Sequence, residues 1–260
     1  MLTYDARAIA ALEKLYSSPQ IVEQRRRLRE AIGARPGESG LDVGCGVAYL
    51  ACELAREVSP GGRIVAVDSS REAVEASRAR LAREGLEEVV EVREADAARL
   101  PFADSSFDFV VAAQVYSYVP DVAGAIREAA RVLKLGGRVI VLESDWDLCT
   151  WASADPALTR RVLQARGAAQ FAHAHLPREL HAHFLAAGMR LADVRCYTMI
   201  ETRYDPESFG AGLIASARAA AIRHGIAREE ADRWANELRS RTGEGEWFFC
   251  LNRFIYTAVR

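Results

Sequence analysis

The sequence predicts an α/β fold: a Rossmann-like, doubly wound sheet of seven mostly parallel strands, with N-terminal helices and a helical lid. Short apolar strands alternate with helical segments between residues 40 and 142, and glycine-rich turns follow the first strand and precede the fifth. Strands that alternate with helices form parallel sheets that helices cover on both faces. The strands expected in this part are Gly40–Val43, Arg63–Val67, Val89–Arg93, Phe107–Ala113 and Arg138–Leu142.

Proline, glycine and capping residues bound the expected helices. Pro19 separates two N-terminal helices, since proline breaks a helix interior but is tolerated in the first turn. Asp121 is expected to cap a helix N-terminus, and Gly188 to end a helix. The expected helices are Asp5–Tyr16, Gln20–Ile32, a stretch that ends at Val58, Ser70–Arg83, Asp121–Leu133, Asp155–Gly167, Pro177–Ala187, Pro206–His224 and Arg228–Arg241.

The alternation of strands and helices stops after residue 142. Leu191–Thr202 is expected to form a long strand, and Glu246–Val259, rich in aromatic and β-branched residues, a final strand. We expect these two strands to pair at one edge of the sheet. The last strand is expected to be antiparallel, because it follows a long helical excursion and must enter from the opposite end.

Charge does not favour a nucleic acid or an acidic membrane as partner. Lys and Arg number 34, Asp and Glu 36, and the formal net charge is −2. Arg25, Arg26, Arg27 and Arg29 lie on one expected helix, where we interpret them as a solvated face rather than a phosphate-binding patch.

Cysteine usage and the absence of long apolar runs predict a cytoplasmic protein. The odd number of cysteines and the lack of a CxxC pair argue against a disulfide framework or a structural zinc site. Met1–Leu15 is charged and lacks a signal-peptide core. No apolar run approaches the length of a membrane span. The five cysteines are Cys45, Cys52, Cys149, Cys196 and Cys250.

Polar residues follow three consecutive strands of the predicted sheet. Gly44 and Gly46 come after the first strand, where they allow a tight turn and close approach of the backbone to a ligand. Asp68 ends the second strand and can accept hydrogen bonds from both hydroxyls of a ribose. Asp96 follows the third strand. Ligands of open α/β sheets bind at these strand ends, so the pattern predicts a nucleoside-containing cofactor.

A nicotinamide dinucleotide is the alternative cofactor. It accounts for Gly44, Gly46 and Asp68, but its fingerprint places a third glycine at position 49, where this chain has Tyr49. It also has no particular use for acids at both Asp42 and Asp96. The three strand-end acids therefore favour a different nucleoside cofactor.

Several motifs resemble those of class I S-adenosylmethionine-dependent methyltransferases. The first motif is Leu41-Asp42-Val43-Gly44-Cys45-Gly46, and the expected ribose acid lies in Val67-Asp68-Ser69. Regions near both ends of the chain also resemble the ubiquinone/menaquinone-biosynthesis-like subgroup (methyltransferase domain 11 type). The remaining matching segments are Asp96-Ala97, Leu100-Pro101-Phe102, Ser106-Phe107-Asp108, Arg131–Gly137, Tyr16–Arg27 and Phe248–Tyr256.

The resemblance implies S-adenosylmethionine as the cofactor and assigns residues to it. The backbone near Gly44 and Gly46 would hold the methionine part, and Asp68 the ribose. Asp96 with Ala97 would hold the adenine, and Gln114 would lie near the sulfonium. The full expected cofactor set is Asp42, Gly44, Gly46, Asp68, Ser69, Asp96, Ala97 and Gln114.

The motifs depart from the family pattern at two positions. Ala48 stands where the family usually has glycine, and we expect it to keep a negative φ, so that the loop differs slightly. Leu135 stands where the family usually has proline, and Gly136-Gly137 can still make the turn. Neither change removes a side chain expected to contact the cofactor.

The resemblance also implies a domain organisation. Residues 1-36 would form N-terminal helices, 37-150 the cofactor-binding core, and 151-260 the acceptor-side helices, lid and last two strands, in a single structural domain. The helices within Pro206–Arg241 are expected to cover the methyl-acceptor side.

A small-molecule acceptor is expected, with an oxygen, nitrogen or carbon nucleophile. The residues expected to bind it are Tyr118, Trp146, Trp151 and Phe171, each of which could instead be a packing anchor. If a general base is used, His173 or His175 is the first choice and Asp147 the second, although exposed helix histidines are common.

A metal site is not expected. Two carboxylates, Asp145 and Asp147, are thin evidence for a divalent ion. His181 and His183 point apart on a helix because they are two residues apart.

Other functions remain open at this point. Gln114-Val115-Tyr116-Ser117 lacks the Asn/Asp-Pro-Pro-aromatic motif of nucleic-acid amino-methyltransferases, which argues against that class. A protein methyltransferase, a nicotinamide reductase on the same scaffold, and a non-catalytic S-adenosylmethionine-binding protein are the alternatives. The oligomeric state is left open.

Overall fold

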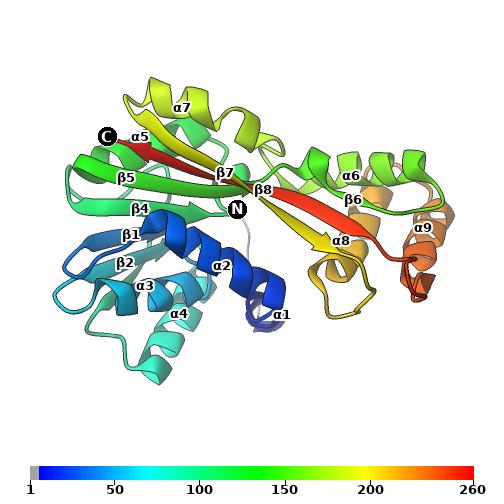
Figure 1. Cartoon of the computed structure of the whole chain (residues 1–260), viewed down its shortest axis with the longest axis horizontal. Helices are drawn as coiled ribbons and strands as arrows, with labels where there is room; N and C mark the ends of the chain where they lie inside the picture. The colour runs from blue at the N-terminus through cyan, green and yellow to red at the C-terminus, as the bar shows by residue number, and fades with distance from the viewer. Residues whose placement is uncertain (1–5) are drawn as a thin grey trace.

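One central sheet organises the molecule (Figure 1). The computed structural model describes residues 6–260. Within them the sheet has eight strands in the order β3-β2-β1-β4-β5-β8-β6, and β7 pairs with β8. The strands are β1 Ser39–Val43, β2 Arg63–Asp68, β3 Val90–Glu94, β4 Phe107–Ala113, β5 Leu133–Ser144, β6 Thr150–Trp151, β7 Arg190–Glu201 and β8 Phe249–Val259.

The two halves of the sheet differ in direction. Strands β1 to β5 pair in parallel. Strand β8 runs antiparallel to β5 and also to β6 and β7. The predicted pairing of the last two long strands is therefore confirmed. The two-residue strand β6 was not expected, and it raises the strand number from the predicted seven to eight.

Helices cover both faces of the sheet because its strands alternate apolar side chains between the faces. Helices α2 Pro19–Ile32, α3 Tyr49–Val58 and α4 Arg71–Glu84 share one core cluster with Ile64 and Phe109. Helices α5 Val122–Val132 and α7 Leu180–Ala186 share the opposite cluster with Val43 and Val65. This is the predicted Rossmann-like layering.

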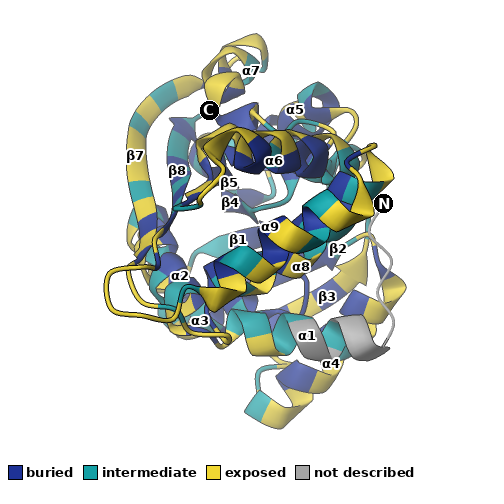
Figure 2. Cartoon of the chain, turned by 90° about the vertical axis from the view of Figure 1, so that its right-hand side faces the viewer, coloured by how far each residue is buried: buried dark blue, intermediate teal, exposed yellow. Residues whose placement is uncertain are grey.

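A third core cluster forms a lobe at one end of the sheet. Its helices are α6 Pro156–Gln170, α8 Phe209–Arg223 and α9 Arg228–Ser240, and β7 and β8 extend into it from the sheet (Figure 1). Trp151, Trp234 and Phe249 pack together in its interior. Figure 2 looks onto this lobe and shows β7 as the largely exposed outer strand.

Short elements complete the chain. Helix α1 spans Ala6–Tyr16, and the 3₁₀ helices are η1 Tyr116–Tyr118, η2 Trp146–Leu148 and η3 Leu176–Arg178. Asp5, the first residue of the predicted N-terminal helix, lies outside the described residues. In the part of the chain that the structure describes, no helix is both long and apolar enough to cross a membrane.

Three local expectations were wrong. Strand β5 begins at Leu133 rather than Arg138, because the segment before the glycine turn also pairs with β4. The single helix expected over Pro177–Ala187 is divided into η3 and α7. Ala48 adopts φ 61°, so it takes the left-handed conformation expected of glycine.

Candidate active site

A cavity of about 320 Å³ lies at the carboxyl ends of β1, β2 and β4. It is called here the first cavity. All of the predicted cofactor residues except Asp42 line it, which brings together side chains from four separate segments of the sequence. The lining residues are Tyr16, Val43, Gly44, Gly46, Asp68, Ser69, Ala95, Asp96, Ala97, Ala113, Gln114, Val115, Tyr118, Val119 and Pro120.

The loop after β1 is closed onto the end of β2 by backbone hydrogen bonds. The Gly44 and Cys45 amides donate to the Val67 carbonyl at 2.7 and 2.9 Å. Gly44 has φ 68°, and a Cβ there would lie 2.3 Å from a Val115 methyl carbon. Position 44 therefore requires glycine on both conformational and steric grounds.

Asp68 is fixed by backbone amides on two sides. Its Oδ2 accepts from the Gly46 amide at 2.9 Å, and its Oδ1 from the Ser70 amide at 2.9 Å. Burial raises the pKa of the Asp68 carboxyl, while these amides oppose the shift. A carboxylate has about four acceptor positions, so lone pairs remain for a ligand.

Gln114 lies between β4 and η1 with φ 59°, a conformation that is uncommon for a residue other than glycine. Its Oε1 accepts from the Ser144 hydroxyl at 2.8 Å. Its Nε2 is buried and has no hydrogen-bond partner among the described residues. Backbone strain together with an unpaired buried donor is typical of a ligand-binding position.

The Glu143 carboxyl accepts hydrogen bonds from the residues that follow Gln114. Its Oε1 accepts from the Val115 and Tyr116 amides at 2.9 and 2.7 Å, and its Oε2 from the Ser117 hydroxyl at 2.9 Å. Burial raises the pKa of Glu143 to about 7. Its carboxyl therefore positions the Gln114 loop.

A second cavity of about 290 Å³ adjoins the first. The two share Tyr16, Gly44, Ala113, Gln114 and Tyr118. The rest of its wall is aromatic and aliphatic with a few buried polar groups. Those residues are Leu12, Leu15, Ile21, Gln24, Arg25, Asp42, Cys45, Tyr49, Leu50, Trp146, Arg166, Phe209, Leu213 and Arg253.

Asp42 faces this second cavity from the end of β1. Burial, and next the charge of Asp68, raise the pKa of Asp42 to about 8. Its Oδ2 is buried without a hydrogen-bond partner among the described residues. An unpaired buried carboxyl oxygen beside Gly44 is suited to a hydrogen-bond donor carried by a ligand.

The segment that forms most of this site matches a known protein family. Residues 41–141 match the model of the family described as "Methyltransferase domain". This segment is a methyltransferase domain. The match confirms the family resemblance that the motifs indicated, and the matched segment contains all the residues expected to bind the cofactor.

Curated relatives match the methyltransferase domain and its surroundings. An uncharacterized 37.1 kDa protein in transposon Tn4556 of Streptomyces fradiae is 40% identical over 152 residues, which are 58% of this chain and 43% of that protein. A demethylmenaquinone methyltransferase of Desulfitobacterium hafniense is 34% identical over 119 residues, which are 46% of this chain and 47% of that protein. The chain spans about half the length of these relatives.

Solved structures share the fold over nearly the whole chain. The YcgJ protein from Bacillus subtilis superimposes with a TM-score of 0.64 at 21% identity, covering 92% of this chain and 98% of that one. At this identity the likeness concerns the fold alone, and it confirms the predicted Rossmann-like α/β class.

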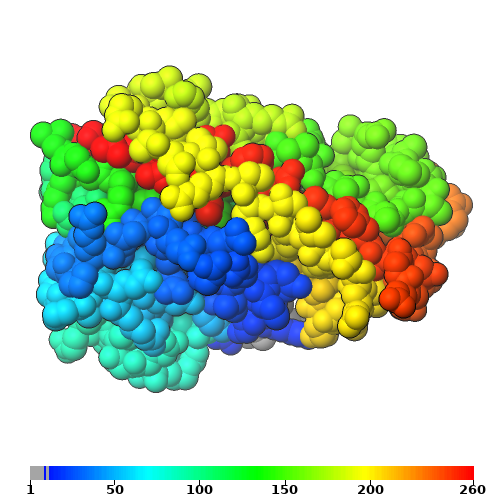
Figure 3. Space-filling model, viewed as in Figure 1, coloured from blue at the N-terminus to red at the C-terminus, as the bar shows by residue number. Residues whose placement is uncertain are grey.

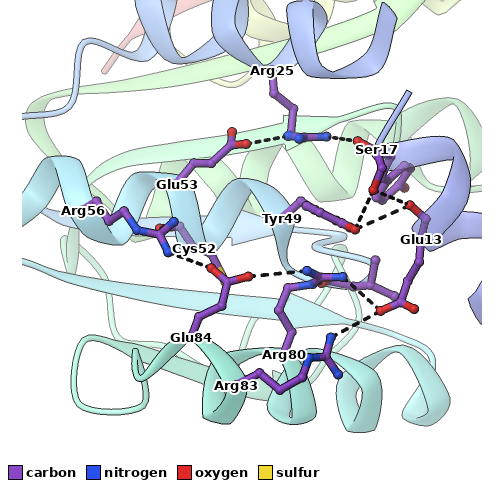
Figure 4. A network of polar contacts seen from close by, with 12 residues as sticks. Glu13, Ser17, Arg25, Tyr49, Cys52, Glu53, Arg56, Arg80, Arg83 and Glu84 are labelled. Carbon is purple, nitrogen blue, oxygen red and sulfur yellow. Dashed lines mark hydrogen bonds and ion pairs between the residues drawn. The ribbon is translucent and has the colours of Figure 1, made fainter. Parts of the chain in front are cut away.

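Helix α1 contributes to the walls of both cavities, which the sequence did not indicate. Tyr16, at its end, lines both of them. The Arg80 guanidinium donates to Glu13 at 2.9 Å and lies 3.6 Å from the centre of the Tyr49 ring (Figure 4). Lys14 pairs with Glu207 before α8. Figure 3 shows the dark-blue N-terminal helices of the described chain lying against the yellow part of the lobe.

The expectation of a solvated arginine face on α2 was wrong for Arg25. Its side chain is buried, and it donates to Glu53 at 3.0 Å and to the Tyr16 carbonyl at 2.6 Å. Arg26 and Arg27 form the expected exposed face, where they pair with Glu23. Arg29 is half-buried and pairs with Glu57.

The predicted acceptor residues are divided between two places. Tyr118 and Trp146 line the second cavity, and Phe171 stacks on Trp146 with ring centres 4.9 Å apart. Trp151 lies in the interior of the lobe, where its Nε1 donates to the Gly210 carbonyl at 3.2 Å. Trp151 lines neither cavity, so its role in acceptor binding stays a prediction without support from this placement.

The predicted bases lie outside both cavities. His173 Nε2 lies 3.2 Å from the Pro120 carbonyl, and His175 Nδ1 lies 3.2 Å from an Asp147 oxygen. Their catalytic role stays a prediction without support from this placement.

The carboxylates near these histidines share one arginine. Arg178 donates two hydrogen bonds to Asp145, at 2.7 and 3.0 Å, and a third to Asp147 at 3.3 Å. Ligand atoms of Asp145, Asp147 and His175 lie within 4.8 Å of one another, but the guanidinium already supplies the positive charge there. This arrangement is that of an ion-pair cluster.

One of the two helices expected in the lid lies elsewhere. Helix α8 reaches the second cavity through Phe209 and Leu213, as expected of the Pro206–Arg241 region. Helix α9 contributes no residue to that cavity and packs behind α8. The lid is therefore made by α1 and α8 together.

Proposed function

We propose that this protein transfers a methyl group from S-adenosylmethionine to a small-molecule acceptor. The observation that carries the proposal is the pair of adjoining cavities in and beside the methyltransferase domain. The first cavity is assigned to the nucleoside part of the cofactor and the second to the acceptor. Gln114 and Tyr118, which line both, would lie where the methyl group passes between them.

The residues present fit this cofactor. Asp68 offers free carboxylate lone pairs to a ribose, and Asp96 and Ala97 lie on the same wall for the adenine. The unpaired Asp42 oxygen suits the ammonium group of the methionine part, and the unpaired Gln114 Nε2 can donate to its carboxylate. These two buried polar atoms would thus each obtain a partner.

The cofactor supplies a methyl group bound to a positively charged sulfur. The acceptor's nucleophilic atom forms a bond to the methyl carbon while the carbon–sulfur bond breaks, and the electron pair of that bond stays on sulfur. A proton on the nucleophile leaves to solvent or to a base. The protein's own part is to align the two molecules and exclude water, which helix α1 and α8 achieve by closing the cavities.

The size and apolar lining of the second cavity favour a small molecule over a protein substrate. Its volume is about 290 Å³, and a drug-sized ligand fills a pocket of roughly this size. Some relatives are called demethylmenaquinone methyltransferases, which supports the class of small-molecule acceptors. Because the chain spans less than two thirds of these relatives, the activity of the whole protein and its acceptor rest on this proposal.

Calorimetry and turnover test the proposal together. We expect S-adenosylhomocysteine to bind the full chain with micromolar affinity, and NADH to show no heat of binding. Incubation with S-adenosylmethionine and a crude metabolite pool should release S-adenosylhomocysteine. Binding without turnover would favour the non-catalytic alternative, and binding of NADH instead would favour a reductase. The predicted cytoplasmic location is a separate expectation.

A further inference from the structure

Two buried arginines of the second cavity have no counter-charge. Arg166 comes from α6 and Arg253 from β8, and they are 5% and 2% exposed. Among the described residues neither guanidinium forms a hydrogen bond or an ion pair, and the Nε atoms of both and one terminal nitrogen of Arg253 are fully buried. Both side chains line the cavity.

The contacts that these arginines do make are with aromatic rings. The Arg166 guanidinium lies 4.0 Å from the centre of the Trp146 ring, and that of Arg253 lies 4.7 Å from the Phe209 ring. An aromatic face attracts a cation but leaves its N–H groups without acceptors. The ring contacts therefore offset only part of the cost of burial.

The third arginine of this cavity differs from these two because its guanidinium is hydrogen-bonded within the protein. Arg25 also lines the wall, but it donates to Glu53 and to the Tyr16 carbonyl. Asp42 is the carboxyl that lines this cavity, and its pKa of about 8 leaves it largely uncharged at neutral pH.

Both unpaired arginines keep their charge at neutral pH. Burial lowers the pKa of Arg253 to about 10 and also lowers the pKa of Arg166. Two positive charges in one small, largely apolar cavity are unfavourable for the folded chain on its own. A purely structural position would tolerate a long apolar side chain at least as well.

We propose, on the basis of the function proposed above, that the acceptor carries an anionic group, a carboxylate or a phosphate, which Arg166 and Arg253 bind. The aromatic rings of Tyr118, Trp146 and Phe209 would hold the apolar body to which that group is attached. Neither arginine lines the first cavity, so the anionic group is bound apart from the shared wall where the methyl group passes. The two arginines thus act in recognition of the acceptor.

Matched charged and neutral probes test this assignment. The full chain, saturated with S-adenosylhomocysteine, is titrated by calorimetry with 2-naphthoate, 2-naphthyl phosphate and the neutral 2-naphthamide. We expect at least one anion to bind at least about tenfold more tightly than the amide, since a charge-assisted hydrogen bond is roughly twice as strong as a neutral one. The stronger of the two anions identifies the class of anionic group.

Three variants locate the effect. Arg166→Met and Arg253→Met should each reduce the affinity for the preferred anion by about tenfold or more, and leave the affinity for S-adenosylhomocysteine unchanged. Arg161→Met, which removes an exposed arginine paired with Glu230 on the same helix α6, should change neither affinity. Equal affinity of the wild-type protein for both anions and the amide would overturn the proposal.

Thermal stability without ligands provides a second readout. Removal of an unpaired buried charge should leave the melting temperature of Arg166→Met and Arg253→Met unchanged or raise it. A fall of several degrees in both would show that the arginines stabilise the fold, and would contradict the proposal. Absence of S-adenosylhomocysteine binding in the wild-type protein would instead defeat the proposed methyltransferase function.

Discussion

The Asp68 carboxylate accepts a hydrogen bond from the Gly46 amide at 2.9 Å, which links the end of β2 to the glycine-rich loop after β1. The contact joins the two elements expected to bind the ribose and the methionine part of the cofactor. Asp68 is thus fixed in place without any ligand.

Substitution of Asp68 tests its role as the ribose acceptor. Two charge-assisted hydrogen bonds contribute roughly 3 kcal/mol together, so Asp68→Ala should weaken S-adenosylhomocysteine binding by about 100-fold. Asp193→Ala, an exposed acid on β7 that pairs with Arg195, is the matched control and should bind normally. Calorimetry on both variants, with circular dichroism as a check of folding, measures this. Wild-type affinity in a folded Asp68→Ala protein would contradict the assignment.

Replacing Ala48 by glycine should stabilise the protein. A φ of 61° is strained for alanine, whereas glycine adopts it without strain. Relief of roughly 1–2 kcal/mol of strain exceeds the entropic cost of glycine, so Ala48→Gly should raise the free energy of unfolding by about 0.5–1 kcal/mol in total. Ala51→Gly, inside helix α3, should lower it by about 1 kcal/mol. Denaturant unfolding of both variants would contradict the account if Ala48→Gly were the less stable of the two.

Asp42 predicts a pH-dependent loss of stability. The carboxyl has a pKa of about 8 in the folded chain and about 4 when unfolded. Between these values the folded state holds a proton that the unfolded state releases, so stability falls as pH rises, by up to about 1.4 kcal/mol per pH unit. Asp42→Asn lacks this proton exchange.

The readout is the difference in melting temperature between Asp42→Asn and the wild-type protein. It should shift in favour of the variant from pH 5 to pH 8 and then level off. Carboxyls that do not interact with Asp42, including Glu143, are common to both proteins and cancel in the difference. A difference that stays constant with pH would show that Asp42 is ionised throughout.

If helix α1 acts as a lid, weakening its attachment should increase the rate of cofactor release. Glu13 on α1 pairs with Arg80 at 2.9 Å, and this pair is partly exposed, so its contribution is on the order of 0.5–1 kcal/mol. Glu13→Ala should therefore speed dissociation of S-adenosylhomocysteine by about two- to fivefold. Glu30→Ala removes an exposed acid paired with Arg26 and should have no effect. Equal stopped-flow dissociation rates in the two variants would argue against α1 as a lid.

The cofactor side could be predicted from sequence because it depends on local signals. Gly44, Gly46 and Asp68 lie at the ends of neighbouring strands, and the parallel pairing of those strands brings them together without further information. The motifs are short, and their spacing follows from the βαβ repeat. The same logic placed Asp96 at the wall of the first cavity, and the family resemblance placed Gln114 there.

The acceptor side could not be predicted in the same way. Arg166 and Arg253 come together only because α6 and β8 pack in the lobe, and nothing in the local sequence marks either as unpaired. Trp151 was assigned to the acceptor by residue type, but an aromatic side chain serves equally well in a core. His173 and His175 were chosen for the pKa of imidazole, which carries no information on which way the side chain points.

Crystals grown with S-adenosylhomocysteine provide the most direct test of the central claim that the two adjoining cavities hold the cofactor and the acceptor. The account predicts electron density in the first cavity, with both ribose hydroxyls at Asp68, the adenine at Asp96 and Ala97, and the sulfur facing the second cavity past Gln114. Density outside the first cavity, or a sulfur atom turned away from the second, would contradict it.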